Sequence, residues 1–512
     1  MKILIFHGYL LRGTGSNIYN ANLAQALARL GHDVHLLCQD RDAEQLEWVD
    51  RIGAWDGGDL TVEEIRPASS AGSVTVYRPP IGNLLPVYVE DPYEGFEARA
   101  FPRLTEEEVE HYIKVNVDAV HDVVEAIGGQ DAALANHLIM GPVVFARAGI
   151  RPYAVKNHGS DLEYIVKPHP RFVPFAEEGL EPAASVLVGS YHTAASLWEA
   201  VPGLPDLEAK TGMGPPGVNT AEFAAIPDER KTPSLLELAE RIAEGPPSTA
   251  FGRDEDAAVE ALREYAAAEG PRVMFVGKLI VSKGVDLLVA AWPLVHAANP
   301  GARLLLIGFG AYEAGLRALV TAIGDGNLEA VAHIAEEGRA LEGGGDKAEP
   351  LSYLNSFLAD LPEGYRDAAI ASAGSVSFGG RFEHHEVAGV LPASDAMVVP
   401  STFPEAFGMV AAEGASCGVL PICAEHSGLA EVTKTLSDEV PAAAELISFD
   451  LGPAAVPDLG DRINRWLGLE PGERDQIGRD IAESADRNWS WEGVAKDVIS
   501  ASAGEVRPVH KP

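Results

Sequence analysis

Short apolar runs, each followed by a glycine-containing loop and a stretch with helical spacing, recur in both halves of the chain. The start of the sequence gives the clearest example, with an apolar run at 2–7, a glycine-bearing loop at 8–15, a helical stretch at 17–30 and a second apolar run at 34–38. A strand, a helix and a second strand in this order form a parallel pair. The pattern therefore predicts an α/β fold that opens with a Rossmann-like, doubly wound unit.

The same rhythm continues far enough for two such domains. We expect further strands at 132–134, 153–156, 184–188, 273–276, 304–307, 376–378, 396–399 and 419–423. Proline and glycine cluster at 214–223, as they do in linkers, and a chain of 512 residues suits two large cores. We therefore predict an N-terminal domain at 1–216, a C-terminal domain at 217–486 and a terminal helix within 487–512.

Three segments interrupt the strand and helix rhythm. Residues 40–103 include the proline-rich sequence RPPIGNLLPVYVEDPYEG, which predicts an irregular excursion. Residues 228–270 are charged and rich in Ala, Glu and Leu, and 327–372 contain the glycine-rich joint LEGGGD, so each predicts a helical insertion. Near the C-terminus, the spacing of Trp489 and Trp491 favours a helix with an aromatic anchor.

The charge balance restricts the partners of the chain. It has 39 basic and 76 acidic side chains, a net charge of −37, which repels nucleic acid and anionic lipid. The same acidity is also typical of salt-adapted or simply soluble surfaces, and composition does not separate these. No long apolar run predicts a spanning helix, and the opening residues lack the pattern of an export leader. Cys38, Cys417 and Cys423 have no metal-ligand spacing, so we expect reduced thiols in a cytoplasmic protein without zinc.

The most specific motif is STFP at 401–404 followed by EAFGMVAAEGASCG at 405–418. If a helix begins near Phe407 or Gly408, its free amides face an anion. Glu405 and Glu413 are then two turns apart, and carboxylates accept hydrogen bonds from sugar hydroxyls. The alternative is a solvated helix face, but the apolar side chains around this pair favour a buried helix start.

The sequence FVGKLIVSKGVD at 275–286 places Gly277, Lys278, Lys283 and Gly284 in one loop between a strand and a helix. Cations at this position neutralise a diphosphate leaving group as its charge develops. The alternative is a pair of surface lysines whose stems cover apolar atoms.

Two further loops follow predicted strands. In KNHGSDLEY, His158 and Asp161 are expected at the crevice where open α/β sheets bind ligands. A structural histidine is the alternative there, and His137 in ALANHLIMG is a weaker competitor for the same role. In RGTGSN, Gly15 and Ser16 suit a close approach to a phosphate or an acceptor, although the dinucleotide fingerprint lacks its third glycine.

Taken together, these motifs resemble the GT-B retaining glycosyltransferases of family four, also called group 1 glycosyltransferases. The likeness covers most of the chain and runs through HGYLLRGTGSN, NHGSD, PPGVN with Phe223, GK with SKG, PEAFG with Glu413, and SGLAEV at 427–432. The chain departs from the family at Lys278, where arginine is more common, so a point charge replaces a bidentate contact.

The resemblance implies roles for individual residues. The N-terminal domain is expected on the acceptor side, the C-terminal domain binds the nucleotide sugar, and the terminal helix crosses back to the N-terminal domain. His158, Lys283 and Glu405 are the expected catalytic residues, and the acceptor guesses are Tyr88, Asp91, Tyr93 and Asp161. The expected donor-binding residues are Gly15, Ser16, Gly277, Lys278, Lys283, Gly308, Arg381, Phe382, Glu405, Ala406, Phe407, Gly408, Met409, Val410 and Glu413.

The implied function is retaining transfer of a hexose-type sugar from a UDP-, GDP- or ADP-sugar to an acceptor hydroxyl, without a metal or another cofactor. The acidity of the chain favours a small soluble acceptor. A nucleotide-sugar epimerase or a phosphorylase has the same architecture and stays an alternative. An NAD-linked oxidoreductase and a non-catalytic sugar-binding protein are poorer rivals, because the fingerprint is incomplete and because binding alone does not require the lysine loop.

Overall fold

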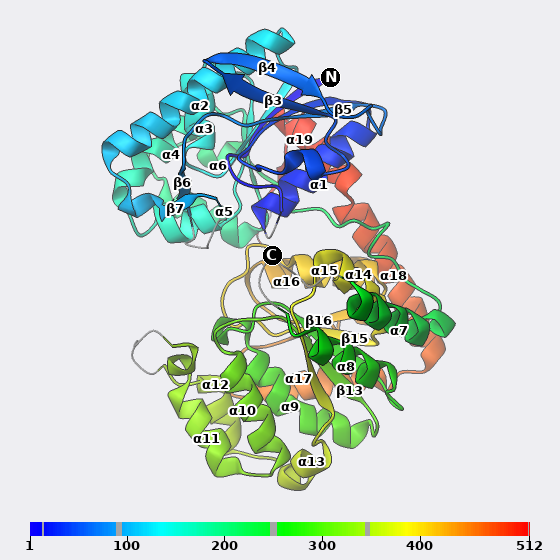
Figure 1. The fold of residues 1–512 in the computed structure, drawn as a ribbon. Helices are drawn as coiled ribbons and strands as arrows, with labels where there is room; N and C mark the ends of the chain where they lie inside the picture. Colours follow the sequence, from blue (N-terminus) through cyan, green and yellow to red (C-terminus); the bar gives the residue numbers. More distant parts are fainter. Residues whose placement is uncertain (13–14, 89–94, 246–252, 344–348, 510, 512) are drawn as a thin grey trace. The chain divides into compact units, whose positions relative to one another are not determined.

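The computed structural model describes residues 1–12, 15–88, 95–245, 253–343, 349–509 and 511 (Figure 1). The chain forms two compact units, one made of Met1–Gly217 with Trp489–Pro512 and the other of Val218–Asn488. The division after Gly217 falls within the proline- and glycine-rich segment 214–223. Among the helices of the described residues, none combines the length and the apolar character needed to cross a bilayer.

The N-terminal unit is built on one twisted sheet with the strand order β18-β11-β10-β9-β8-β1-β2-β5-β3-β4. In the described strands the pairing is parallel, apart from β4 against β3 and β18 against β11. The strands are β1 (Lys2–Phe6), β2 (Asp33–Leu37), β3 (Arg51–Asp56), β4 (Asp59–Glu64), β5 (Ser73–Tyr77), β8 (Ala132–Asn136), β9 (Ala154–Lys156), β10 (Ser185–Val188), β11 (Thr211–Met213) and β18 (Arg507–Pro508).

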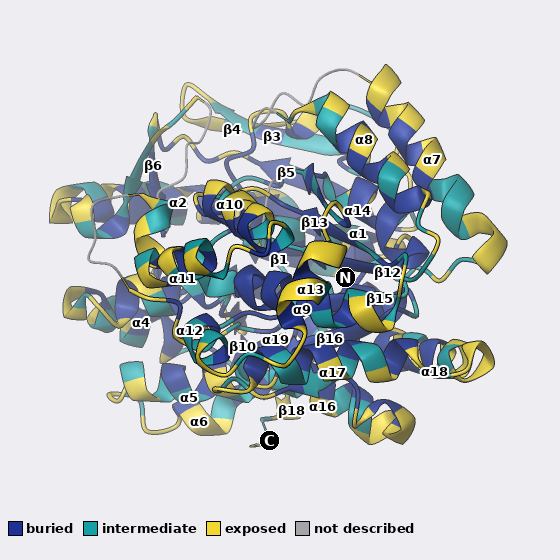
Figure 2. Ribbon diagram, turned by 90° about the horizontal axis from the view of Figure 1, so that it is seen from below, coloured by how far each residue is buried: buried dark blue, intermediate teal, exposed yellow. Residues whose placement is uncertain are grey.

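Both faces of this sheet are covered by helices, because alternate residues of a strand point to opposite faces. On β1, Ile3 and Ile5 pack in one core with α1 (Ser16–Arg29) and α19 (Trp491–Ser502). Leu4 and Phe6 pack in the other core, with α2 (Glu106–Ile127) and α3 (Gly141–Arg147). In Figure 2 the central strands are largely in the buried colour, whereas β3 and β4 at the edge are not, and the outer helix faces are exposed. The other helices of this unit are α4 (Val173–Leu180), α5 (Tyr191–Ala200) and α6 (Leu207–Lys210).

Local signals fix the ends of the longest helix in this unit. The Thr105 side chain accepts from the Glu108 amide, and the Glu108 carboxylate accepts from the Thr105 amide, so the helix α2 starts with a capping box. Gly128 ends it in the left-handed conformation. The first residues after the apolar strands are thereby held at one edge of the sheet.

The expectation of an irregular excursion at 40–103 is wrong. This segment contains β3, β4 and β5, which extend the main sheet, and β6 (Leu84–Val87) paired with β7 (Glu97–Ala100). The edge strand β4 is almost wholly exposed, and its two alternating apolar residues, Leu60 and Val62, give only a short signal among polar residues. The proline-rich sequence begins after β5. Because the whole segment was judged by these prolines, the strands that precede them were not predicted.

The C-terminal unit is built on a parallel sheet with the order β14-β13-β12-β15-β16-β17. Its strands are β12 (Arg272–Val276), β13 (Arg303–Ile307), β14 (Val376–Gly380), β15 (Ala396–Val399), β16 (Leu420–Ala424) and β17 (Ser448–Phe449). The strands predicted in both halves are confirmed to within two residues at each end. Apart from β14, whose residues are alternately buried and half-buried, these strands are largely buried, which is why short apolar runs marked them.

Helices fill the predicted insertions of this unit. The segment 228–270 contains α7 (Asp228–Glu244) and α8 (Glu255–Ala266), and 327–372 contains α11 (Leu328–Glu337), α12 (Ser352–Ala359) and α13 (Tyr365–Ala371). The remaining helices are α9 (Val285–Ala298), α10 (Glu313–Gly324), α14 (His384–Val390), α15 (Met409–Ser416), α16 (Ser427–Glu439), α17 (Ala455–Leu467) and α18 (Pro471–Trp489).

The terminal helix predicted at 487–498 is two helices in the structure. The helix α18 ends at Trp489, Ser490 is extended, and α19 begins at Trp491. Both tryptophans are buried, and Trp491 packs edge-on against Tyr19 of α1 at 5.4 Å between ring centroids. The aromatic anchor therefore attaches α19 to the N-terminal unit.

Candidate functional site

In the C-terminal unit, the loops after β12, β13, β14 and β15 all leave the carboxyl edge of the sheet. Two glycines let these loops pack closely. A Cβ on Gly284, which has φ +63°, would lie 2.1 Å from the Pro400 carbonyl oxygen. A Cβ on Gly308 would lie 1.8 Å from the Gly277 carbonyl oxygen. The Thr402 amide also donates to the Ser282 carbonyl at 2.9 Å. The lysine loop and the PEAFG loop are therefore held together by backbone contacts.

This packing brings Lys283 and Glu405 into contact across 122 positions of sequence, through an ion pair between Lys283 Nζ and Glu405 Oε1. Ser401 Oγ donates to the same carboxylate oxygen at 2.6 Å, and the Glu405 amide donates to Ser427 Oγ at 2.9 Å. The side chains of Lys283 and Glu405 are 29% and 24% exposed. The pair is therefore accessible to a ligand.

The helix expected near Phe407 or Gly408 is α15, which begins at Met409 with Gly408 as its first cap. Glu405 lies in the loop before this helix, so the two glutamates are not two turns apart on one helix, and the axial spacing expected from the sequence is wrong. Met409 and Val410 are half-buried in the first turn, where backbone amides have no partner within the helix.

Glu413 lies on α15 and is 4% exposed. It accepts a hydrogen bond from His384 Nε2 at 2.8 Å, and the imidazole also contacts the Phe223 ring at 4.8 Å between centroids. Burial alone would lower the pKa of His384, but the hydrogen bond and the charge of Glu413 outweigh it and raise the pKa. His384 was missed from the sequence, although FEHHEV follows a predicted strand and places two histidines at a helix start.

The other expected donor residues differ in accessibility. Lys278 is exposed and has no ion pair with a described residue. Phe382 is 8% exposed and lies under the Arg253 guanidinium, so its ring faces the protein. The Arg381 guanidinium lies over the Phe309 ring at 5.7 Å and pairs with Glu383. Phe407 is buried, whereas Gly277, Ala406 and Gly408 are half-buried.

In the N-terminal unit, buried polar groups follow β1, β8 and β9 at the carboxyl edge of the sheet. Asn136 Oδ1 accepts from His158 Nε2 at 2.8 Å and from Asn20 Nδ2 at 3.1 Å. The pKa of His158 is far below its usual value because of burial and because His137, Lys156 and His7 lie nearby. His158 is therefore neutral with its proton on Nε2, which leaves Nδ1 as a hydrogen-bond acceptor.

Lys156 and His7 belong to the same cluster and were missed from the sequence. Lys156 Nζ donates to the Gly214 carbonyl at 2.8 Å, and burial lowers its pKa to about 7 while the charge of Asp161 opposes this shift. His7 is buried with its Nε2 at 3.0 Å from both the Leu10 carbonyl and Asn17 Oδ1, and burial is the largest cause that lowers its pKa to about 3. The sequence does contain a signal for Lys156 and His7, because each lies at the end of an apolar run that predicts a strand.

Asp161 was expected to contact an acceptor, but its side chain is fully buried and accepts from the Leu138 amide. His137 adopts φ +70° and lies 3.7 Å from Asp161, with its ring at 4.9 Å from the His158 ring. Neither ring nitrogen of His137 has a hydrogen-bond partner among the described residues. In this structure Asp161 therefore holds the turn at His137 and Leu138.

The other residues that the sequence predicts to bind an acceptor or a donor in this unit lie in loops or at the start of a helix. Tyr88 is buried and donates to the Ile139 carbonyl at 3.1 Å, so its hydroxyl is already used. Asp91 and Tyr93 lie outside the described residues. Gly15 caps α1 and is exposed, and Ser16 is half-buried in the first turn.

Cys38, Cys417 and Cys423 are buried free thiols, and burial raises the pKa of each. Within the described part of the chain, no group of three or more His, Cys, Asp or Glu side chains is arranged to hold a metal ion.

Comparison with known proteins gives a family match and one distant relative. Residues 369–445, which include His384, Glu405 and Glu413, match the family model described as glycosyl transferases group 1. A GDP-mannose-dependent monoacylated alpha-(1-6)-phosphatidylinositol monomannoside mannosyltransferase from Corynebacterium glutamicum is 25% identical over 243 residues. The matched region spans 46% of this chain and 48% of that protein.

Solved structures resemble nearly the whole chain. Sucrose-phosphate synthase from Thermosynechococcus elongatus has a TM-score of 0.53 at 18% identity, over 97% of this chain and 96% of that one. The catalytic domain of starch synthase IV from Arabidopsis thaliana, bound to ADP and acarbose, has a TM-score of 0.58 at 14% identity, over 98% and 99%. Identities this low show the fold alone, and that fold is GT-B, with two Rossmann-like domains.

Proposed function

We propose that this chain, a group 1 glycosyltransferase by its motifs and its family match and a GT-B protein by its fold, transfers a hexose-type sugar with retention of configuration. The donor is a UDP-, GDP- or ADP-sugar, the acceptor is a hydroxyl of a small soluble molecule, and no metal is required. The observation that carries the proposal is the contact of Lys283 with Glu405 just before the amide end of α15.

Donor binding exchanges the partners of this ion pair. Lys283 turns to the diphosphate, Glu405 accepts hydrogen bonds from the sugar, and the first-turn amides of α15 face the negative charge. A partly exposed pair contributes only ~0–1 kcal/mol, so it opens at small cost. Glu413, held by His384, is assigned to the ribose hydroxyls, and Lys278 adds a second cation in the same loop.

The reaction breaks the bond between the sugar C1 and the leaving phosphate oxygen and forms a bond between C1 and the acceptor oxygen. In a retaining reaction without an enzymatic nucleophile, the leaving phosphate accepts the acceptor's proton on the same face. Negative charge grows on that phosphate as the bond breaks, and Lys283 stabilises it. In the N-terminal unit, neutral His158 is assigned a hydrogen bond from a substrate hydroxyl to Nδ1.

The proposal is tested first by binding. UDP, GDP and ADP are added separately to the protein, and the matching diphosphate is expected to raise the melting temperature in a concentration-dependent way. Glu405→Gln and Lys283→Ala should weaken binding of the matching sugar nucleotide and leave the melting temperature of the free protein nearly unchanged.

Product analysis then separates the reaction classes. NMR of the product with the matching donor should show the anomeric configuration of the donor retained, with equal activity in EDTA. Conversion of the donor to another sugar nucleotide without any acceptor would identify an epimerase instead. If no nucleotide diphosphate stabilises the protein and no sugar nucleotide is consumed, the proposed function is wrong.

A further inference from the structure

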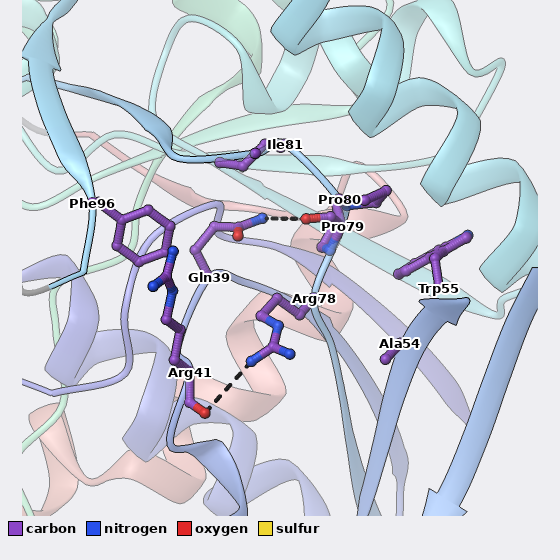
Figure 3. Close-up of a pocket in the computed structure, with 10 residues that line it drawn as sticks. Gln39, Arg41, Ala54, Trp55, Arg78, Pro79, Pro80, Ile81 and Phe96 are labelled. Atoms are coloured by element: carbon purple, nitrogen blue, oxygen red, sulfur yellow. Dashed lines mark hydrogen bonds between the residues drawn. The ribbon is translucent and has the colours of Figure 1, made fainter. Parts of the chain in front are cut away.

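A cavity of about 410 Å³ opens in the N-terminal unit, beyond the carboxyl ends of β2, β5 and β3 (Figure 3). In parallel sheets of this kind, ligands bind at this edge. The same edge carries His7 after β1 and His158 after β9, so the cavity lies on the continuation of the edge that holds the buried polar cluster. Its lining residues are Gln39, Arg41, Ala54, Trp55, Arg78, Pro79, Pro80, Ile81, Gly82 and Phe96.

Two arginines give this cavity a positive charge in a strongly acidic protein. Arg41 and Arg78 are both exposed, and neither forms an ion pair with a carboxylate of the described residues. Elsewhere in this unit, exposed arginines such as Arg51 and Arg147 do have carboxylate partners. Because the net charge of the chain is −37, a pair of guanidinium groups without acidic partners is the local exception. Their planar donors match phosphate and carboxylate oxygens.

The first guanidinium is held in place before any ligand binds. The Arg41 guanidinium lies 4.1 Å from the centre of the Phe96 ring, and its Nη2 is 3.5 Å from Asn83 Oδ1. A Cβ on Gly95 would lie 2.6 Å from Arg41 Nη1, so the backbone also covers this side chain. Arg78 reaches the Arg41 carbonyl at 3.5 Å. Figure 3 shows both side chains on the same side of the cavity.

The rest of the lining suits a carbohydrate. Trp55 and Phe96 are half-buried. The Arg41 guanidinium covers one face of the Phe96 ring, so Trp55 is the aromatic ring assigned to the C–H groups of a sugar. Gln39 is 3% exposed, and its Nε2 donates to the Pro79 carbonyl at 3.0 Å, which fixes the orientation of the amide. Trp55 is likewise fixed, because its Nε1 donates to Asp122 at 2.7 Å. A cavity of fixed polar and aromatic side chains, with two arginines that have no carboxylate partner among the described residues, fits an anionic sugar better than a nucleobase or an apolar chain.

We propose that this cavity binds the acceptor and that the acceptor is an anionic sugar, bearing a phosphate monoester or a carboxylate that Arg41 and Arg78 hold. This inference rests on the proposed transferase function and names its substrate class. Four strand spacings separate the ends of β9 and β5, on the order of 19 Å. An acceptor that contacts both His158 and the arginines is therefore longer than one hexose.

The binding experiment uses the full chain without any donor and needs no knowledge of the complete acceptor. Calorimetric titrations are made with glucose 6-phosphate, glucuronate, glucose and inorganic phosphate. We expect glucose 6-phosphate or glucuronate to bind about tenfold more tightly than glucose. If glucose 6-phosphate binds more tightly than glucuronate, the acceptor is phosphorylated. If glucuronate binds more tightly, the acceptor carries a carboxylate. Raising the salt concentration should weaken either.

Variants locate the binding. Arg41→Ala and Arg78→Ala should each weaken the anionic sugar about tenfold, and Arg78→Lys should retain part of the affinity. Arg51→Ala is the control, since Arg51 lies at the opposite end of β3 and carries the same charge, and it is half-buried and paired with Glu64. All of these variants should bind the nucleotide diphosphate as the unchanged protein does, because the donor residues lie in the C-terminal unit.

Several results would overturn the inference. Equal affinity for charged and uncharged sugars, no saturable binding of either anion, or equal losses in the Arg51→Ala control would each exclude an anionic sugar at this cavity. Binding to phosphatidylglycerol vesicles that depends on both arginines, with none to the soluble sugars, would replace the sugar by a lipid surface. Normal nucleotide diphosphate binding in the same preparations would show that only this inference, and not the proposed transferase, had failed.

Discussion

Replacing Lys283 with alanine is the sharpest test of the donor site. In the free protein this change removes an ion pair whose side chains are 29% and 24% exposed, which is worth ~0–1 kcal/mol. Glu405 keeps its hydrogen bond from Ser401 Oγ at 2.6 Å, so no carboxylate is left buried and unpaired. The fold and the melting temperature should therefore change little.

The effect on turnover is expected to be far larger than the effect on stability. A positioned electrostatic donor to the developing charge contributes about 2.7–4 kcal/mol in a closed site, which corresponds to a loss in kcat of about 100- to 1000-fold. Lys278→Ala is the matched control, because it removes the same charge from the same loop. Since Lys278 is exposed and solvated, we expect a loss of about tenfold or less.

The assay measures nucleotide diphosphate release under saturating donor, with the melting temperature followed in the same samples. Lys283→Arg should recover part of the rate, because it restores a positive charge. A kcat for Lys283→Ala within threefold of the unchanged protein would refute the assignment. A variant that fails to melt cooperatively would show instead that Lys283 has a structural role.

Three further predictions follow from other residues. Burial raises the pKa of Asp286 to about 7, so its contribution to stability is full below about pH 4 and is lost as the pH rises through 7. Asp286→Asn should therefore stabilise the protein at pH 8, by at most about 4 kcal/mol, and not at pH 4; equal melting temperatures of both proteins at pH 8 would contradict this. Asn136→Ala removes the acceptor of His158 Nε2, so kcat should fall by about tenfold while nucleotide diphosphate affinity measured by titration stays constant; an unchanged kcat would remove the positioning role. Gly308→Ala should cost several kcal/mol in denaturant unfolding, because the new methyl meets the Gly277 carbonyl, whereas Gly472→Ala has open space and should cost little; similar costs at both would count against the packing argument.

The parallel strands could be predicted from the sequence because both of their faces are buried. Each then appears as a short continuous apolar run, and β1, β12 and β15 were recognised in this way. The edge of the N-terminal sheet could not be found by the same rule. Strand β4 is mostly exposed and β3 is only half-buried, so neither appears as a continuous apolar run, and their short alternating patterns do not distinguish them from a loop.

The candidate site divides in a similar way. The motif order predicted Lys283 and Glu405 near one another, because loops after parallel strands meet at the carboxyl edge whatever their separation in sequence. The partners of Glu413 and His158 were not predicted. His384 begins α14 and Asn136 ends β8, and each meets its partner only because elements distant in the sequence pack together in the fold. The burial of Asp161 could not be predicted either, because the motif around it is polar and yet its side chain is fully buried.

The two units hold their polar groups in different physical states, and the difference bears on what each can do. In the C-terminal unit the Lys283 and Glu405 pair is partly exposed, so its charges can exchange one partner for another at small cost. In the N-terminal unit His7, Asn136 and His158 are desolvated and neutral, and hydrogen bonds link His7 through Asn20 to Asn136 and Asn136 to His158. Such a network is costly to rearrange, so the proposed mechanism uses it to orient a substrate hydroxyl. The proposed mechanism assigns stabilisation of the leaving phosphate to the partly exposed lysine loop, and this is why the substitution of Lys283 tests that assignment.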